Sequence, residues 1–206
     1  MSIETEFPVP LDRSVVLEKL KDYKRPNDKI SEMIKSGELI SLRRGLYIDG
    51  SQLDKIEIFL VANHLRGPSY VSLESALSYW EMIPERVFEV SSVTLKTSKT
   101  YRTALGRFSY HHQNAPYYSF GIKSIELAQN QFAMIASPEK ALCDKIILTA
   151  GIQLKSIIQT FEFLIEDLRI EEDVLKRLNP EIIQNWVDDA PKKENLKMLI
   201  KSLRKL

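Results

Sequence analysis

The chain has 206 residues, of which 44% are hydrophobic and 28% are charged, and it contains seven glycines and nine prolines. These values are ordinary for a soluble folded protein and exclude long disordered or low-complexity stretches. The formal net charge is only +1, so the total charge does not by itself indicate a nucleic-acid-binding protein.

The cysteine content and the first residues bear on the compartment. A single cysteine, Cys143, excludes an intramolecular disulfide and fits a reducing environment. The first ten residues, MSIETEFPVP, lack the apolar core of a signal peptide. No apolar run approaches the roughly 20 residues that a membrane-spanning helix needs. We therefore expect a cytoplasmic protein with no membrane partner.

Charge is segregated along the chain. Residues 19–47 hold eight Lys or Arg against four acids, and residues 96–107 hold four basic residues without an acid. Residues 190–206 are also basic, with Glu194 as their one acid, whereas acidic residues gather between Glu162 and Asp173. Such segregation indicates a side of the molecule that faces a polyanion.

The first predicted helix follows an irregular arm of ten residues and covers about residues 11–23. Three apolar residues have helical spacing in it, namely Val15, Val16 and Leu20. Proline disfavours the α conformation in the residue before it, so the pair Arg25–Pro26 ends this helix. Pro26 in turn suits the first turn of a new helix, where its missing N–H is not needed.

The second predicted helix covers about residues 27–36. Its spacing places Ile30, Met33 and Ile34 on one apolar face. Gly37 follows where a left-handed C-terminal cap is required. The other face of this helix is polar, which leaves it free for contacts outside the protein.

A basic hairpin is predicted directly after the second helix. From Leu39 the sequence pattern changes to a period of two residues, which indicates a strand. Arg43-Arg44-Gly45 then forms a turn before a second strand over residues 46–48. Helix, tight turn, helix and basic hairpin together predict a winged helix-turn-helix-like segment over residues 1–50. A short polar linker around Gly50 then leads to a second domain, residues 51–206.

The second domain is predicted to combine helices with one sheet. Alternating segments between residues 87 and 136 predict a mixed or antiparallel sheet of four or five strands. Helices are expected over about residues 53–65, 72–80 and 138–149, and the remainder is helical. The fold class is therefore α+β, with a small N-terminal segment, a mixed-sheet domain and a helical C-terminal part.

The N-terminal segment carries the candidate contacts to double-stranded DNA. In a helix-turn-helix the second helix enters the major groove, and flanking basic side chains hold phosphates. Asparagine pairs with adenine, and lysine with guanine or phosphate. The predicted DNA-binding residues are Lys24, Arg25, Asn27, Lys29, Ser31, Lys35, Arg43 and Arg44.

The basic stretch from Lys96 to Arg107 has two interpretations. Its lysines, arginines and hydroxyl groups are good phosphate donors, so it is a candidate for a second phosphate-contacting strand or loop. Lysines also keep the exposed edge of a sheet soluble. Of the two, we favour the exposed edge or hairpin.

A nuclease-like interpretation of the segment after residue 136 is weighed and disfavoured. A metal-dependent nuclease needs at least two carboxylates that converge on a metal. Asp144 follows Glu139 by five residues, which does not place both cleanly on one helix face. Ser137 and Pro138 are better explained as the start of a helix.

Other catalytic or metal-binding patterns are missing from the sequence. One cysteine and three histidines make no zinc-binding constellation, and adjacent His111 and His112 would point to opposite faces of a strand. No phosphate-binding, dinucleotide-binding or hydrolase motif occurs. We therefore expect no enzymatic activity, no metal and no cofactor.

Three segments, in their order and spacing, resemble the AbiEi antitoxin family. They are residues 35–47 (KSGELISLRRGLY), residues 70–77 (YVSLESAL) and residues 136–144 (ASPEKALCD). The resemblance covers about residues 10–150. Proteins of this family are the regulator and antitoxin halves of type IV toxin–antitoxin and phage-defence pairs.

The resemblance implies a function for each part of the chain. The winged-helix segment would bind an inverted repeat in the operator of its own operon, with Lys29, Ser31, Lys35, Arg43 and Arg44 in the DNA-facing role. The C-terminal domain would counter a cognate nucleotidyltransferase-like toxin. The segment from residue 137 to residue 144 would have a structural role only.

Two alternatives stay open beside the regulator. The first is a protein-interaction module of the same family that does not bind DNA but still relieves the toxin. The second is an enzyme, either a nuclease or a modifier of the toxin, for which Glu139 and Asp144 would be the residues to test.

Overall fold

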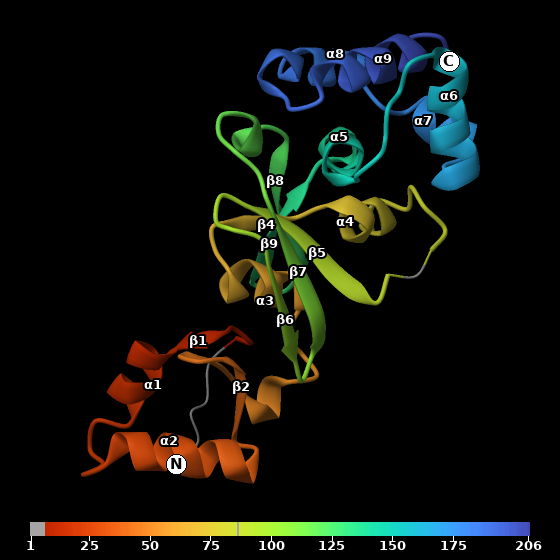
Figure 1. Ribbon diagram of the computed structural model, residues 1–206. Helices are drawn as coiled ribbons and strands as arrows, with labels where there is room; N and C mark the ends of the chain where they lie inside the picture. The colour runs from red at the N-terminus through yellow and green to blue at the C-terminus, as the bar shows by residue number, and fades with distance from the viewer. Residues whose placement is uncertain (1–6, 86) are drawn as a thin grey trace.

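The structure is a computed structural model and describes residues 7–85 and 87–206 (Figure 1). It combines helices with two sheets, one of them mixed, which confirms the predicted α+β class. The N-terminal elements lie at one end of the molecule and the C-terminal helices at the other, with the larger sheet between them (Figure 1).

Five elements form what we call the N-terminal unit. They are β1 (Leu11–Asp12), α1 (Arg13–Lys19), α2 (Pro26–Ser36), β2 (Leu39–Arg43) and β3 (Leu46–Asp49). The strands make an antiparallel sheet in the order β1-β3-β2. Helix α2 begins at the predicted proline and ends at Gly37, whose φ of 81° is left-handed, so this prediction is confirmed.

The larger sheet has six strands in the order β6-β7-β5-β4-β9-β8. They are β4 (Ser69–Val71), β5 (Glu89–Thr94), β6 (Lys99–Thr103), β7 (Gly106–His112), β8 (Ile122–Ala128) and β9 (Gln131–Ala136). The pairs β4/β9 and β5/β7 are parallel and the other pairs are antiparallel. β6 and β8 are therefore the two edge strands.

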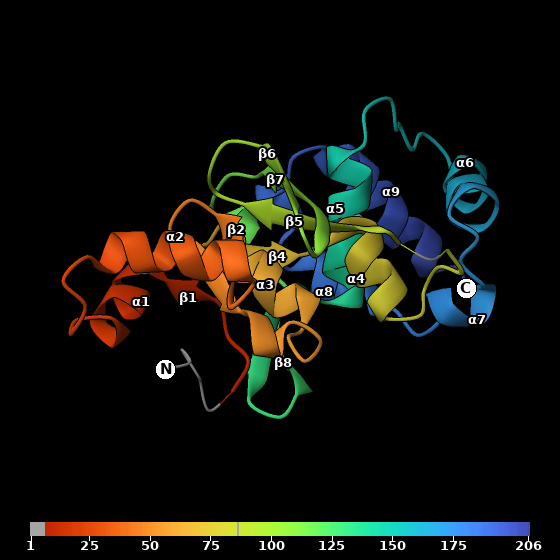
Figure 2. The same cartoon turned by 90° about the horizontal axis from the view of Figure 1, so that it is seen from below.

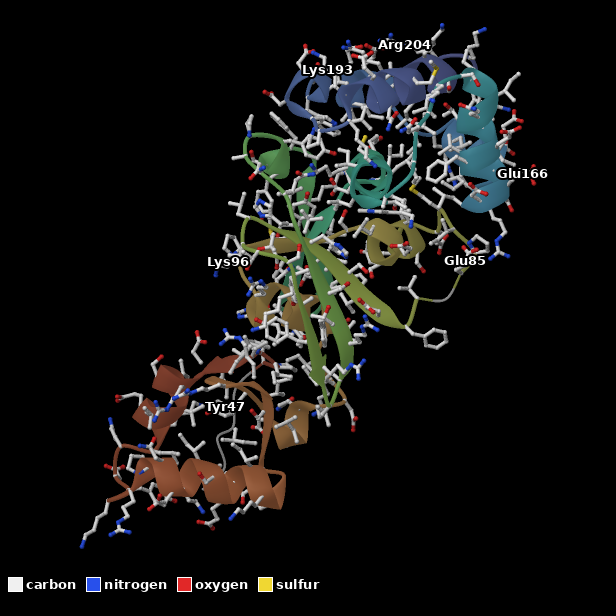
Figure 3. All side chains as sticks on the ribbon, viewed as in Figure 1. Tyr47, Glu85, Lys96, Glu166, Lys193 and Arg204 are labelled. Carbon is white, nitrogen blue, oxygen red and sulfur yellow. The ribbon has the colours of Figure 1, made fainter. Side chains whose placement is uncertain are left out.

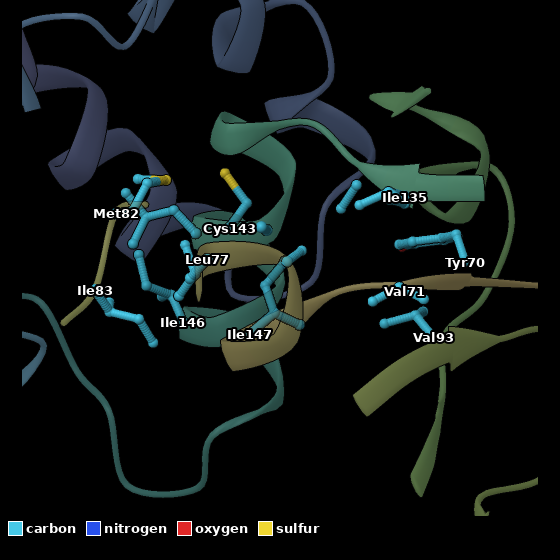
Figure 4. Packing of buried hydrophobic residues seen from close by; sticks show 14 of the residues in the cluster. Tyr70, Val71, Leu77, Met82, Ile83, Val93, Ile135, Cys143, Ile146 and Ile147 are labelled. Carbon is cyan, nitrogen blue, oxygen red and sulfur yellow. The ribbon is translucent and has the colours of Figure 1, made fainter. Parts of the chain in front are cut away.

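Helices cover both faces of this sheet (Figure 1). On one face lies α3 (Ile58–Leu65), where the hydroxyl of Tyr110 donates to the carbonyl oxygen of Ala62 at 2.6 Å. On the other face lie α4 (Leu73–Tyr79) and α5 (Pro138–Leu148). Figure 4 shows part of the core there, with Leu77 of α4 beside Ile146 of α5.

The C-terminal part is helical, as predicted. It contains α6 (Ile157–Phe161), which continues as a π-helix over Glu162–Asp167, then α7 (Glu172–Leu175), α8 (Pro180–Gln184) and α9 (Lys193–Leu203). Short 3₁₀ turns lie at Gly50–Gln52, Tyr117–Ser119 and Val187–Asp189. Helices α8 and α9 pack against α5, and α6 packs against α9, at the end of the molecule that is far from α2 (Figure 1).

The β2–β3 hairpin packs on both of its faces. Side chains alternate between the two faces of a strand. On one face Leu39 and Tyr47 join the small core of the N-terminal unit. On the other face Leu42, Leu46 and Ile48 join the large core of the rest of the molecule. The hairpin therefore fixes the N-terminal unit to the larger sheet.

Gly50 fixes the other end of this hairpin. A Cβ atom at this position would lie 2.0 Å from the carbonyl oxygen of Gly37, so only glycine allows the approach. The amide of Gly50 donates to the carbonyl oxygen of Glu38 at 2.8 Å. The side chain of Asp49 accepts from the amide of Ser51 at 2.9 Å, so the segment predicted to be a linker is ordered by its own hydrogen bonds.

Several sequence-based boundaries were wrong. Leu11 lies in β1 because it pairs with Tyr47, so the first helix begins only at Arg13. Ile34 was assigned to the apolar face of α2 but is 38% exposed, and Val15, which was grouped with Val16 and Leu20, is 43% exposed. Helix α3 begins at Ile58 rather than near residue 53. The sheet has six strands rather than four or five, because β4 lies before the segment in which strands were predicted.

A buried ion pair within α5 is hydrogen-bonded to the end of strand β4. The ammonium of Lys140 lies 3.3 Å from Oδ1 of Asp144, and neither side chain is exposed. Oδ2 of Asp144 accepts from the hydroxyls of Tyr70 at 3.0 Å and Ser72 at 2.7 Å. Lys140 also donates to the carbonyl oxygen of Tyr117 at 2.8 Å. Burial lowers the pKa of Lys140 and raises that of Tyr70.

Breaking this pair should destabilise the fold strongly. Asp144→Asn keeps the shape of the side chain but leaves the ammonium of Lys140 buried without a counter-charge. We expect the free energy of unfolding to fall by about 3–5 kcal/mol, which is typical when one partner of a buried pair is removed. Urea denaturation followed by circular dichroism measures the change.

The matched control replaces both partners. Because the double variant Lys140→Met/Asp144→Asn contains no buried charge at this position, it should be more stable than Asp144→Asn alone. If Asp144→Asn unfolded at the same urea concentration as the wild type, the pair would have no role in stabilising the fold.

Candidate nucleic-acid interface

Helix α2 lies at one end of the molecule (Figure 1), and most of its polar side chains are exposed. Ile30 and Met33 are 5% and 1% exposed and face the core of the N-terminal unit. Figure 2 views the molecule from that end and shows α2 in the foreground. No other described helix covers the outer face of α2 in either view. The helix is therefore accessible to a large partner.

Six of the eight predicted DNA-binding residues are exposed. They are Lys24, Arg25, Asn27, Ser31, Lys35 and Arg44. The other two, Lys29 and Arg43, are partly buried. By position, Arg43 and Arg44 lie at the hairpin tip, and the other six, Lys29 included, lie on α2 or just before it.

The first turn of α2 is held by a hydrogen bond from the preceding helix. A guanidinium nitrogen of Arg13 donates to Oδ1 of Asn27 at 2.6 Å, and the hydroxyl of Ser31 donates to the carbonyl oxygen of Asn27 at 3.0 Å. The backbone amide of Arg13 also donates to the carbonyl oxygen of Gly45 at 3.0 Å. Arg13 therefore links the start of α2 to the hairpin tip.

Lys29 is the predicted contact residue with the nearest carboxylate partner. Its ammonium lies 2.9 Å from a carboxylate oxygen of Glu32 and 5.9 Å from the centre of the Tyr23 ring. Hydrogen bonding to Glu32 raises the pKa of Lys29. A phosphate would have to compete with this carboxylate, so Lys29 is poorly placed for DNA contact unless Glu32 moves.

Three of the predicted cations are better placed. Within the described residues, the side chains of Lys24, Lys35 and Arg44 have neither a hydrogen-bond partner nor an ion-pair partner. Arg25 lies 3.8 Å from Asp28, with both side chains largely exposed, so this pair is weak. Lys24, Lys35 and Arg44 therefore offer free charge to an anion.

The arginines of the hairpin tip lie beside the larger sheet. Nε of Arg43 donates to the carbonyl oxygen of Leu65 at 2.9 Å, and another of its nitrogens donates to the carbonyl oxygen of Arg44 at 3.2 Å. These acceptors are backbone groups, so the guanidinium charge of Arg43 is not neutralised by a described carboxylate. The turn itself needs Gly45, whose φ is 82°.

The hairpin tip also borders a pocket of about 440 Å³. We call it the basic pocket; it is lined by Arg43, Arg44, Leu65, Arg66, Gly67, Lys96, Lys99 and Tyr101. Lys96, labelled in Figure 3, lies on the side of the larger sheet above the N-terminal unit. The strand order confirms that the Lys96–Arg107 stretch contains an edge strand, β6, and the start of that stretch also joins the pocket.

The sequence did not predict that four further basic residues lie near the N-terminal contacts. They are Arg13, Arg66, Lys96 and Lys99. The basic stretch at residues 96–107 was noticed, but nothing in its pattern placed it next to residues 43–44. The contact between β2 and β6 brings the two together. Arg66 is a single arginine at the end of a helix and had no sequence signal.

The carboxylates considered for nuclease chemistry are engaged inside the protein. Glu139 is 8% exposed and accepts from the hydroxyl of Ser137 at 3.0 Å and the amide of Asn179 at 3.2 Å. Asp144 is fully buried and has different partners, described above. Across the described chain, no group of three or more acidic, histidine or cysteine side chains is arranged to hold a metal.

Comparisons with known proteins add no family to this description. No protein-family model matches the chain, and no curated protein matches it. In residues 7–85 and 87–206, no helix has the length and apolar composition needed to cross a membrane.

Removing the carboxylate beside Lys29 tests whether α2 contacts the phosphates of DNA. Glu32→Gln frees the ammonium of Lys29 and adds one unit of positive charge to this face. We expect tighter binding of duplex DNA, and a slope of log K against log salt that steepens by about 0.9 if one phosphate contact is gained. Fluorescence anisotropy over a salt series measures both quantities.

Glu18→Gln is the matched control. Glu18 in α1 pairs at 3.2 Å with Lys21, which lies just after that helix, and the two residues are three positions apart, like the pair on α2. The control should leave the affinity and the salt slope nearly unchanged. An equal gain from both variants would mean that net charge, rather than the face of α2, governs the interaction.

Proposed function

We propose that this protein is a transcriptional regulator of the antitoxin type. Its N-terminal unit binds operator DNA of its own operon as a winged helix-turn-helix, and the rest of the chain counteracts a nucleotidyltransferase-like toxin. The first activity is argued from the geometry of the N-terminal unit, and the second from the sequence resemblance to the AbiEi family.

The order of elements in the N-terminal unit carries the DNA-binding proposal. A short strand precedes two helices, a hairpin follows them, and the first strand pairs with the hairpin in the sheet β1-β3-β2. This order is typical of winged helix-turn-helix proteins, in which the second helix enters the major groove. Here that helix is α2, and its outer face is polar and exposed.

The charges around α2 agree with this docking. Lys24 and Arg25 flank the N-terminal end of the helix, Lys35 lies near its C-terminal end, and Arg44 lies at the hairpin tip. Phosphate contacts of this kind set position and orientation on the duplex. Asn27 and Ser31 lie between them and are exposed; to read a base edge, Oδ1 of Asn27 would have to release Arg13 and the hydroxyl of Ser31 would have to release the carbonyl oxygen of Asn27.

The antitoxin half of the proposal uses the three segments that resemble the AbiEi family. Two of these segments are in contact, namely residues 70–77 and residues 136–144. The hydroxyls of Tyr70 and Ser72 donate to the carboxylate of Asp144. Their shared role is thus to hold the sheet and α5 together, which agrees with a structural rather than a catalytic motif.

Operator binding is tested by removing the three free cations. The variant Lys24→Ala/Lys35→Ala/Arg44→Ala should bind an inverted repeat upstream of its own gene more weakly by about tenfold or more. Its salt slope should fall by about 2.7, because each lost phosphate contact removes about 0.9. Mobility-shift titrations at several salt concentrations measure both effects.

A matched triple variant removes the same charge at the far end of the molecule. Lys197→Ala/Lys201→Ala/Lys205→Ala changes exposed lysines in and after α9. It should bind the operator with wild-type affinity. Equal weakening by both triple variants, or no binding of the operator by the wild type at low salt, would refute the DNA-binding proposal.

Toxin relief is tested separately by co-expression. A nucleotidyltransferase-like reading frame next to the gene should arrest growth when expressed alone, and co-expression of this protein should restore it. We expect the DNA-binding triple variant to relieve the toxin fully. Relief without any operator binding by the wild type would instead identify a protein-interaction module of the same family.

A further inference from the structure

The basic pocket joins two parts of the chain that are distant in sequence. Arg43 and Arg44 come from the β2–β3 hairpin, Arg66 follows α3, and Lys96 and Lys99 lie before and at the start of β6. Its volume of about 440 Å³ lies within the range of sites for small molecules. A single phosphate on a convex surface does not need a cavity of this size.

The pocket concentrates positive charge without a counter-charge. Five of the residues that line it are cations, and none of the described lining residues is acidic. None of the five takes part in an ion pair within the described part of the chain. Like charges held together in this way repel each other, and an anion with more than one negative charge would relieve the repulsion.

Arg66 is held rigidly at the pocket wall. Two of its nitrogens donate to the hydroxyl of Tyr101 at 3.4 Å and to Oγ1 of Thr97 at 3.0 Å. Its Nε atom is buried and has no hydrogen-bond partner among the described residues. A guanidinium group that is oriented by neutral partners keeps its full charge for a ligand.

Three of the other four cations are also oriented by neutral groups. The ammonium of Lys96 donates to the carbonyl oxygen of Gly67, and Lys99 lies 4.8 Å from the centre of the Tyr101 ring. Nε of Arg43 is bound to the carbonyl oxygen of Leu65. The site is therefore preorganised, which lowers the entropic cost of binding.

We propose that the basic pocket binds a small ligand with two or more adjacent phosphoryl groups, such as inorganic pyrophosphate or the di- or triphosphate of a nucleotide. Binding of this ligand does not depend on the proposed regulator function. The regulatory effect of the ligand does rest on the proposed regulator function. Because Arg44 belongs to both the pocket and the proposed DNA interface, the ligand would compete with operator DNA.

Isothermal titration of the full chain with inorganic pyrophosphate and with ATP tests the proposal. Both should bind saturably, at one site per chain. Arg66→Ala should weaken binding about 10- to 100-fold, as expected for the loss of a charged hydrogen bond. Because Arg66 also ties two segments together, Lys99→Ala provides a second variant at an exposed position, and circular dichroism checks that both variants fold.

Arg102→Ala is the matched control. Arg102 is an exposed arginine on β6 that does not line the pocket, so its loss removes the same charge from the same strand. We expect an affinity for pyrophosphate within about twofold of the wild type. Equal weakening by Arg66→Ala, Lys99→Ala and Arg102→Ala would overturn the proposal, because binding would then reflect general charge.

A second pair of measurements separates this proposal from the regulator function. Lys24→Ala/Lys35→Ala leaves the pocket intact, so it should lose operator affinity but keep pyrophosphate affinity. If the wild type bound neither pyrophosphate nor ATP while Arg66→Ala weakened operator binding, the pocket would belong to the DNA interface and the small-ligand proposal would be wrong.

Discussion

The position of every candidate contact depends on how the β2–β3 hairpin is buried. In many hairpins at the edge of a protein, only one face is apolar. Here Leu39 and Tyr47 face one core, and Leu42, Leu46 and Ile48 face the other. Each buried side chain of this size contributes about 1.5–3 kcal/mol. Burial of these apolar side chains, rather than polar contacts, therefore fixes the position of α2 at the end of the molecule and places the hairpin tip beside β6.

Local signals predicted the parts of the fold that depend on local chemistry. Pro26 and Gly37 mark the ends of α2, Gly45 marks the hairpin turn, and Ser137 caps α5 by accepting from the amide of Lys140 at 3.2 Å. These residues act on the backbone within a few positions of themselves. Their effects can therefore be read from the sequence without knowledge of the tertiary structure.

The wrong predictions concern elements whose conformation depends on residues that are distant in the sequence. Leu11 is a strand residue only because Tyr47 lies opposite it. β4 has three residues, too few to show a period of two, and it exists because β5 and β9 flank it. For the same reason the sequence identified the basic segments at residues 19–47 and 96–107 separately. Only the packing of the hairpin beside β6 brings Arg43 and Lys99 to one pocket.

The double burial of the hairpin also limits how the molecule can be divided. A fragment cut after residue 50 would transfer Leu42, Leu46 and Ile48 to water and would retain only the small core around Met33. An unpaired apolar strand face of this kind promotes aggregation and domain swapping. The complementary fragment would in turn lose the cover over its own apolar residues. Experiments on isolated halves would therefore test altered surfaces, so each proposed activity should be measured on the intact chain.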